Sequence, residues 1–245
     1  MTRATILIPA RWGSTRFPGK PLHLLAGKPL IQHVWERCCR VPGVDRIIVA
    51  TDDTRILEAA FDFGAEVALT SVKHPSGTDR LAEVARNLPR SSLILNAQGD
   101  EPFLDPRLAS RVIEALRTDP SAQMATAACP LAPNDLENPN CVKVVTSLAG
   151  HALYFSRCPI PFDRDGDARP KRFRHLGLYA YRRDFLLDLV TNRPSPLEKS
   201  EKLEQLRALE HGAKIRVVLA KAAGPGIDTP ADARAAEILL RRARK

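Results

Sequence analysis

Short runs of β-branched and aliphatic residues alternate with helical windows through the first hundred residues, and this alternation constrains the fold most. Apolar residues recur at helical spacing in windows such as Leu81–Leu88 and Leu108–Leu116. Strands that alternate with helices are typical of βαβ units in a parallel sheet covered on both faces. We therefore predict an α/β fold with a mostly parallel twisted sheet flanked by helices. The runs predicted as strands are Thr5–Ile8, Arg46–Thr51, Glu66–Leu69 and Leu93–Asn96.

The pattern changes after about Met124. Strand-like runs then follow one another without long helices between them, which predicts a smaller antiparallel insertion at about residues 130–185. The segment Phe162–Arg174 is rich in charge and is predicted to be a loop. We predict one domain over residues 1–245 that contains this insertion. The runs in question are Val142–Thr146, Ala152–Phe155 and Leu178–Tyr181.

The last part of the chain returns to the α/β pattern. A helix over Lys199–His211 is predicted to end at Gly212, a common residue after a helix C-terminus. A strand over Ile215–Ala220 follows. The final helix, Pro230–Arg244, has proline at its first position and Thr229 as its expected N-cap.

The composition excludes several classes of protein. The 245 residues are 44% hydrophobic and 27% charged, which is typical of a globular chain and not of a disordered one. No apolar stretch reaches the roughly 18 residues of a membrane span, and no cleavable leader is apparent. Five cysteines without a C-x-x-C pair indicate reduced thiols, and a cytoplasmic protein is therefore expected. The net charge of +9 points weakly to anionic partners, since many surface cations only interact with solvent.

The loop after the first predicted strand carries the strongest functional signal. It reads PARWGSTRFPGKP from Pro9 to Pro21, and ligands of open α/β sheets bind beyond the carboxyl ends of strands. Arg11, Arg16 and Lys20 would neutralise a polyphosphate, and the glycines let the backbone approach it. The spacing fits neither the P-loop nor the dinucleotide motif. An ordinary basic surface loop is the alternative.

Two carboxylates occupy comparable positions near strand ends. Asp100 follows the strand Leu93–Asn96 within Gln98–Pro102, and a carboxylate there suits Mg²⁺ held together with substrate phosphates. The same residues also form a good turn. Asp228 lies between the last strand and the last helix, where spacing alone favours a capping role.

Motifs distributed over the whole chain, taken together, resemble the 3-deoxy-D-manno-octulosonate (Kdo) cytidylyltransferases. The N-terminal loop motif is shared with CMP-sialate synthetases, but the combination is specific. The matching segments are PARWGSTRFPGKPL, SGTDR at Ser76–Arg80, QGDEP at Gln98–Pro102, NPNCVKVV at Asn138–Val145, ALYFSR at Ala152–Arg157, RHLGLYAYRR at Arg174–Arg183, EKLEQLRALEHG at Glu201–Gly212 and IDTP at Ile227–Pro230.

The resemblance implies a nucleotidyltransferase-type fold, a homodimer and the insertion as the region of sugar binding and dimerisation. It also implies a reaction in which CTP and Kdo give CMP-Kdo and pyrophosphate for lipopolysaccharide synthesis. Asp100 and Asp228 are implied as the Mg²⁺ ligands, and both act in catalysis with Arg11 and Lys20. The implied nucleotide-binding residues are Pro9, Ala10, Arg11, Ser14, Arg16, Lys20, Ser76, Arg80 and Gln98.

The resemblance also implies an acceptor site, in which Arg157 would pair with the Kdo carboxylate. Each assignment has a plainer alternative, such as a structural ion pair for Arg157 or a core position for His175. Adjacent residues on a helix point about 100° apart, so one of Glu204 and Gln205 is expected to face the substrate. The implied acceptor residues are Gln98, Arg157, His175, Tyr179, Glu204 and Gln205.

Some features depart from the family pattern and leave alternatives open. Trp12 and Phe17 stand where relatives commonly carry Tyr and Leu, and the segment between Pro161 and His175 is shorter than in many of them. The acceptor is therefore Kdo or a related acid sugar such as 8-amino-Kdo or a sialic acid. A basic nucleic-acid-binding protein is a third hypothesis, ranked low because aromatic residues make up only 5% of the chain. We expect small-molecule substrates, no nucleic acid and no membrane insertion.

Overall fold

The structure is a computed structural model that describes residues 4–13, 17–90, 92–166, 168, 170–222 and 224–242. The chain forms two compact units. The first comprises Met1–Ser110 and Gly224–Lys245, and the second comprises Arg111–Ala223. The boundary falls within helix α4 (Pro106–Thr118). A single functional domain over the whole chain stays a prediction.

The first unit is built on a parallel sheet with the strand order β6-β1-β4-β5. The strands are β1 (Ala4–Ala10), β4 (Arg46–Thr51), β5 (Glu66–Leu69) and β6 (Leu93–Asn96). All four runs predicted from the sequence are confirmed, and β1 is longer than predicted at both ends. Every residue of β1 except Pro9 is buried, as expected for a central strand covered on both faces.

Helices connect the parallel strands of the first unit, because a parallel connection needs a crossover. Helix α1 (Leu30–Cys38) precedes β4, α2 (Thr54–Asp62) precedes β5, and α3 (Gly77–Ala85) precedes β6. The sequence predicted the buried face of α3, since Leu81 and Ala85 are fully buried.

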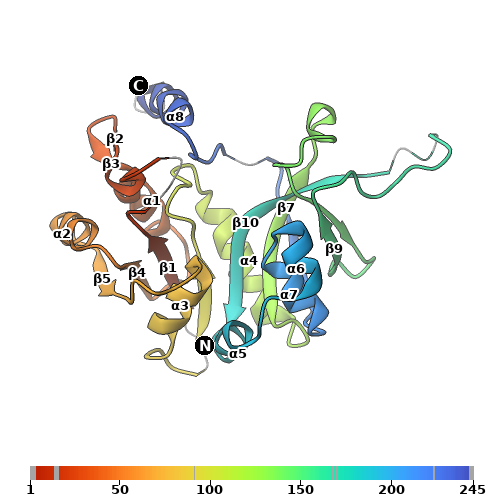
Figure 1. The fold of residues 1–245 in the computed structure, drawn as a ribbon, viewed down its shortest axis with the longest axis horizontal. Coiled ribbons are helices and arrows are strands. Elements are labelled where there is room, and N and C mark those ends of the chain that lie inside the picture. Colours follow the sequence, from red (N-terminus) through yellow and green to blue (C-terminus); the bar gives the residue numbers. More distant parts are fainter. Residues whose placement is uncertain are drawn as a thin grey trace. The chain divides into compact units, whose positions relative to one another are not determined.

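The C-terminal helix belongs to the first unit and packs near its N-terminal part. Helix α8 (Pro230–Arg242) lies beside the small hairpin of β2 (Leu24–Leu25) and β3 (Lys28–Pro29) (Figure 1). Its buried residues share an apolar cluster with Phe17 and Leu30. The segment that leads into α8 is thereby held against the elements that follow β1.

The second unit contains the predicted antiparallel region. Strand β10 (Phe173–Arg182) pairs antiparallel with β7 (Met124–Pro130), and β11 (Ile215–Leu219) pairs parallel with β7. A ribbon of β8 (Lys143–Thr146) and β9 (Ala152–Ser156) continues from β10. The α/β fold class with a smaller antiparallel part is confirmed.

The helices of the second unit differ from prediction in one place. Helix α5 (Arg183–Thr191) follows β10, and the single helix predicted over residues 199–211 is wrong. Two short helices, α6 (Pro196–Glu201) and α7 (Gln205–Glu210), replace it. Lys202 ends α6 in the left-handed conformation, with φ 55° and ψ 48°. Helical periodicity does not reveal a lysine in this conformation.

None of the helices in the described residues is both long and apolar enough to span a membrane.

Gly99 sets the distance between the turn after β6 and the end of β1. A Cβ atom at this position would lie 2.7 Å from the backbone oxygen of Pro9, closer than real Cβ atoms approach. The turn therefore approaches β1 more closely than a residue with a Cβ atom at position 99 would allow.

We expect Gly99→Ala to lower the free energy of unfolding by about 1–3 kcal/mol, because the added methyl group must push two backbone segments apart. Gly226→Ala is the matched control, since a Cβ there would have no neighbour within 4 Å among the described residues. Urea unfolding measures both variants. Equal stability of the two would contradict the proposed constraint.

Candidate functional site

The loops after β1 and β6 meet at one edge of the sheet in the first unit. The two strands are parallel neighbours with Leu7 opposite Asn96, and the backbone amide of Ala97 donates to the Leu7 oxygen over 3.1 Å. Parallel neighbours end at the same edge, so the residues that follow them are brought together. A cleft of about 250 Å³ lies there.

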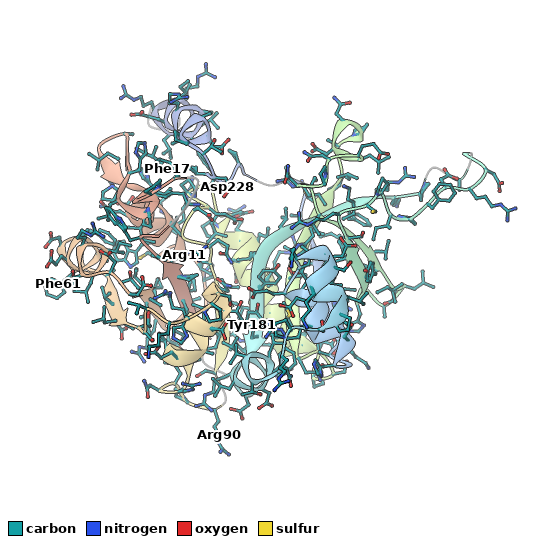
Figure 2. The ribbon with its side chains drawn as sticks, in the orientation of Figure 1. Arg11, Phe17, Phe61, Arg90, Tyr181 and Asp228 are labelled. Carbon is teal, nitrogen blue, oxygen red and sulfur yellow. The ribbon has the colours of Figure 1, made fainter. Side chains whose placement is uncertain are left out.

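All the predicted nucleotide and metal residues in the described part of the chain line this cleft. Arg11 comes from the loop after β1 and Asp228 from the segment before α8 (Figure 2). Ser14 and Arg16 lie outside the described residues. The predicted residues that line the cleft are Pro9, Ala10, Arg11, Lys20, Ser76, Arg80, Gln98, Asp100 and Asp228.

Lys20 joins the two predicted metal ligands. Its Nζ donates to Oδ2 of Asp100 over 2.6 Å and lies 3.7 Å from Oδ1 of Asp228. The third contact is a 2.8 Å hydrogen bond to the backbone oxygen of Ile227. Only 14% of the lysine side chain is exposed. One cation therefore already lies within reach of both carboxylates.

A backbone hydrogen bond holds the segment that carries Asp228 beside Asp100. The amide of Ile227 donates to the Asp100 oxygen over 3.0 Å, and the Ile227 side chain is buried. Thr229 accepts a hydrogen bond from the amide of Asp232 over 3.2 Å, as its predicted N-cap role requires. Thr229 is thus the N-cap, as predicted, and it already fills the capping role that was the alternative for Asp228.

Arg80 lines the cleft from a buried position. Its Nη2 donates to Oδ2 of Asp52 over 2.7 Å, and Nη1 donates to the hydroxyl of Thr70. The arginine side chain is only 4% exposed, and buried charges are normally paired in this way. The role of Asp52 was missed, although its place directly after β4 was visible in the sequence.

The N-terminus of α3 also opens on the cleft. Ser76 caps the helix, since its Oγ accepts from the amide of Asp79 over 3.3 Å. Ser76 and Gly77 both line the cleft. The first amides of a helix favour an anion, which suits a phosphate group.

His74 is a lining residue that the sequence analysis missed. Its Nε2 contacts Oε2 of Glu83, which also accepts from the backbone amide of Ser71 over 3.0 Å. The Ser71 amide, and next the imidazole, hold the pKa of Glu83 below its usual value. His74 is two residues before the SGTDR motif, and that proximity was the available signal.

Of the predicted acceptor residues, Gln98 belongs to the first unit and the other five belong to the second. In the second unit His175 is buried between aromatic rings, 4.9 Å from Phe155 and 5.3 Å from Tyr179 between centroids. Burial lowers the pKa of His175 to about 3. The ring is therefore neutral near pH 7.

The hydrogen bonds of Thr126 fix the tautomer of this ring. Its hydroxyl lies 2.8 Å from the Leu178 backbone oxygen and 2.9 Å from Nε2 of His175. The carbonyl can only accept, so the single hydroxyl hydrogen goes to Leu178 and Nε2–H of His175 donates to Thr126. Nδ1 of His175 is then the acceptor nitrogen.

Tyr179 packs against the ring of His175 and is also hydrogen-bonded to Gln205. The Tyr179 hydroxyl donates to Oε1 of Gln205 over 3.3 Å. Gln205 is 3% exposed, and its Nε2 has no hydrogen-bond partner among the described residues. Glu204, the residue before α7, is only partly buried, whereas Gln205 is buried as the helix begins.

In the described part of the chain, the Arg157 guanidinium is bound by backbone oxygens and not by the carboxylate that a structural ion pair would require. Nε donates to the Glu201 oxygen over 2.7 Å and Nη1 to the Pro139 oxygen over 2.8 Å. Nη2 has a longer contact of 3.5 Å with the Lys202 oxygen. The guanidinium is therefore oriented by the backbone while its charge stays unneutralised by these partners.

The buried imidazole predicts a pH dependence of stability. The pKa of His175 is about 3 in the fold and near 6.5 when unfolded, so the unfolded chain takes up a proton between these values. The free energy of unfolding should therefore fall by about 2 kcal/mol between pH 7 and pH 5 through this residue.

His175→Gln should remove that part of the pH dependence, whereas the exposed His211→Gln should retain it. Urea unfolding at both pH values measures the difference. An unchanged pH dependence in the His175 variant would show that the ring is not buried in its neutral form.

Comparisons with known proteins agree with the fold. The sequence model of the cytidylyltransferase family matches residues 5–215. A 3-deoxy-manno-octulosonate cytidylyltransferase of Syntrophobacter fumaroxidans is 52% identical over 92% of each chain. The enzyme of that name from Anaeromyxobacter dehalogenans is 51% identical over 98% of each chain.

Solved structures give the same result. One of CMP:2-keto-3-deoxy-manno-octonic acid synthetase complexed with CTP matches with a TM-score of 0.94, at 42% identity, over 98% of this chain and 99% of that one. A 4-diphosphocytidyl-2C-methyl-D-erythritol synthase from Anaerococcus prevotii matches at 16% identity with a TM-score of 0.67, covering 98% of this chain and 99% of that one, and supports the fold alone. The chain belongs to the cytidylyltransferase family and, within it, to the 3-deoxy-manno-octulosonate cytidylyltransferases.

Proposed function

We propose that this chain transfers CMP from CTP to the anomeric hydroxyl of 3-deoxy-D-manno-octulosonate and releases pyrophosphate. The observation that carries the proposal is the cluster of Lys20, Asp100 and Asp228 in a cleft at the carboxyl edge of the sheet. Relatives of about 50% identity over almost the whole chain carry the name of this activity.

The chemistry requires in-line attack of the acceptor hydroxyl on the α-phosphorus of CTP. The bond from that phosphorus to the oxygen that bridges it to the β-phosphate breaks as the new bond to the sugar oxygen forms. Pyrophosphate leaves with the bridging oxygen, and the hydroxyl proton passes to water. Such reactions depend on positioning and charge neutralisation more than on covalent chemistry. Arg11 and Lys20 supply positive charge for the leaving pyrophosphate, and the N-terminus of α3 adds amide donors.

Asp100 and Asp228 would hold Mg²⁺. The fit is supported by the short distances from both carboxylates to Nζ of Lys20, since two oxygens that reach one cation can share another. Mg²⁺ commonly takes one or two carboxylates together with substrate phosphates. Bound there, the ion would stabilise negative charge that develops on the phosphate oxygens.

The second unit supplies groups suited to an acid sugar. The buried Nε2 of Gln205 has no acceptor in the part of the chain that the structure describes, and such a donor is costly unless a ligand accepts from it. His175 is neutral and contributes hydrogen bonds, not charge. The oriented guanidinium of Arg157 would bind the carboxylate of the acceptor.

The homodimer and the cytoplasmic location belong to the proposal as well. In the second unit the ribbon of β8 and β9 exposes Leu148 at its turn and Leu153 on β9, which suits burial against a second copy.

Pyrophosphate release tests the proposed reaction. We expect release only when CTP, Mg²⁺ and Kdo are all present, because the nucleotide, the ion and the attacking hydroxyl all take part in the proposed step. Parallel reactions with 8-amino-Kdo and with a sialic acid determine which acid sugar is preferred. Release in the absence of any acid sugar, or none with all of them, would contradict the proposal.

Gln205→Met is the variant arm of this experiment. It should raise the KM for Kdo and leave the KM for CTP within about twofold, because methionine keeps the side-chain volume and removes the donor together with the oxygen that binds Tyr179. Thermal unfolding of the same variant should show no loss of stability. An unchanged KM for Kdo would exclude Gln205 from the acceptor site.

A further inference from the structure

We infer that Lys143 is a positioning residue for the acceptor acid, acting through the guanidinium of Arg157. This inference rests on the proposed function, in which Arg157 binds the acceptor carboxylate. Lys143 was part of a matching motif in the sequence, but no role follows from that match.

Lys143 is a fully buried lysine on β8. Its relative exposure is 0%, and it is among the largest fully buried side chains in the described residues. Nζ donates to the backbone oxygen of Asn138 over 2.8 Å and to that of Arg157 over 2.9 Å. In the described part of the chain its hydrogen bonds thus go to neutral carbonyl groups and not to a carboxylate.

A buried ammonium group with neutral partners is a poor source of stability. Removing a charge from water is costly, and hydrophobic residues of similar volume often replace buried ions without loss of stability. Lysine is almost never fully buried without a charged partner. The location of Lys143 therefore points to a requirement other than folding.

The partners of Lys143 show what that requirement is. One carbonyl belongs to Arg157 itself, and the other belongs to Asn138. The next residue, Pro139, accepts the hydrogen bond from Nη1 of Arg157 over 2.8 Å. Lys143 thus joins the backbone of Arg157 to the turn that orients its side chain.

Glu201 holds Arg157 from the other side. Its carboxylate accepts from the Ser156 hydroxyl over 2.6 Å and from the Arg157 backbone amide over 2.9 Å. Its backbone oxygen accepts from Nε of Arg157. Nε and Nη1 are therefore fixed, and among the described residues Nη2 has only the long contact to Lys202.

This geometry leaves Nη2 as the part of the guanidinium best placed to bind a carboxylate. Its direction depends on the turn of Asn138 and Pro139, which Lys143 holds. Loss of the ammonium would release the turn and let the guanidinium rotate. A displacement of a binding group by about 1 Å can reduce turnover by about 100-fold.

The test compares Lys143→Met with Lys214→Met, which alters an exposed lysine of the same unit. Steady-state kinetics with varied Kdo should show a KM raised about 10- to 100-fold in the Lys143 variant, with the KM for CTP within twofold. The Lys214 variant should match the wild-type chain. Lys143→Gln replaces the ammonium donors with amide donors and should raise the KM for Kdo less than Lys143→Met does. It takes the place of Lys143→Met if the methionine variant does not fold.

A double-mutant cycle with Arg157→Ala separates positioning from a general structural effect. If Lys143 acts through Arg157, adding Lys143→Met to Arg157→Ala should raise the KM for Kdo no further. If the increase in the KM for Kdo in the double variant equalled the product of the two single increases, the inference would be overturned. An unchanged KM in Lys143→Met would overturn it as well.

A second readout needs no acceptor and no turnover. Hydrogen exchange of the Arg157 Nε–H, followed by NMR, should accelerate about tenfold or more in Lys143→Met. If the wild-type chain released no pyrophosphate with Kdo, the proposed function would fail while this measurement still judged the role of Lys143. Unchanged exchange would overturn the inference.

Discussion

The contact between Lys20 and Asp100 is the interaction on which the nucleotide cleft depends. It draws together the loop after β1, the turn after β6 and the segment before α8, which a backbone hydrogen bond from Ile227 completes. The carboxylates of Asp100 and Asp228 both lie within 3.7 Å of the Lys20 ammonium, whose positive charge offsets their mutual repulsion. The chain thus supplies its own cation, so the cleft is organised before any substrate enters.

The second unit contains buried polar groups that cost folding stability. Among the described residues, Nε2 of Gln205 has no hydrogen-bond partner, His175 is buried in its neutral form, and Lys143 is buried against carbonyl groups. Burial of such polar groups costs stability. This cost is consistent with our proposal that they belong to the site for a polar, anionic sugar.

The sequence was sufficient to predict the parallel sheet and the cleft, because the carboxyl ends of parallel strands necessarily meet. The pairing of Asp228 with Asp100 was predicted only from the family resemblance, because it depends on a backbone contact between segments that are distant in the sequence. The helix break at Lys202 was missed because no glycine marks it. The burial of Lys143 was missed because a lysine between valines resembles an ordinary strand position.

Calorimetric titration of CTP with and without Mg²⁺, in the absence of acceptor, tests the central claim most directly. The wild-type chain should bind CTP about tenfold or more tightly with Mg²⁺, and Asp100→Asn should lose most of that difference because the ion loses a carboxylate. Asp62→Asn, an exposed carboxylate of the same unit, should behave as wild type. Equal affinity for CTP with and without Mg²⁺ in the wild-type chain would contradict the account.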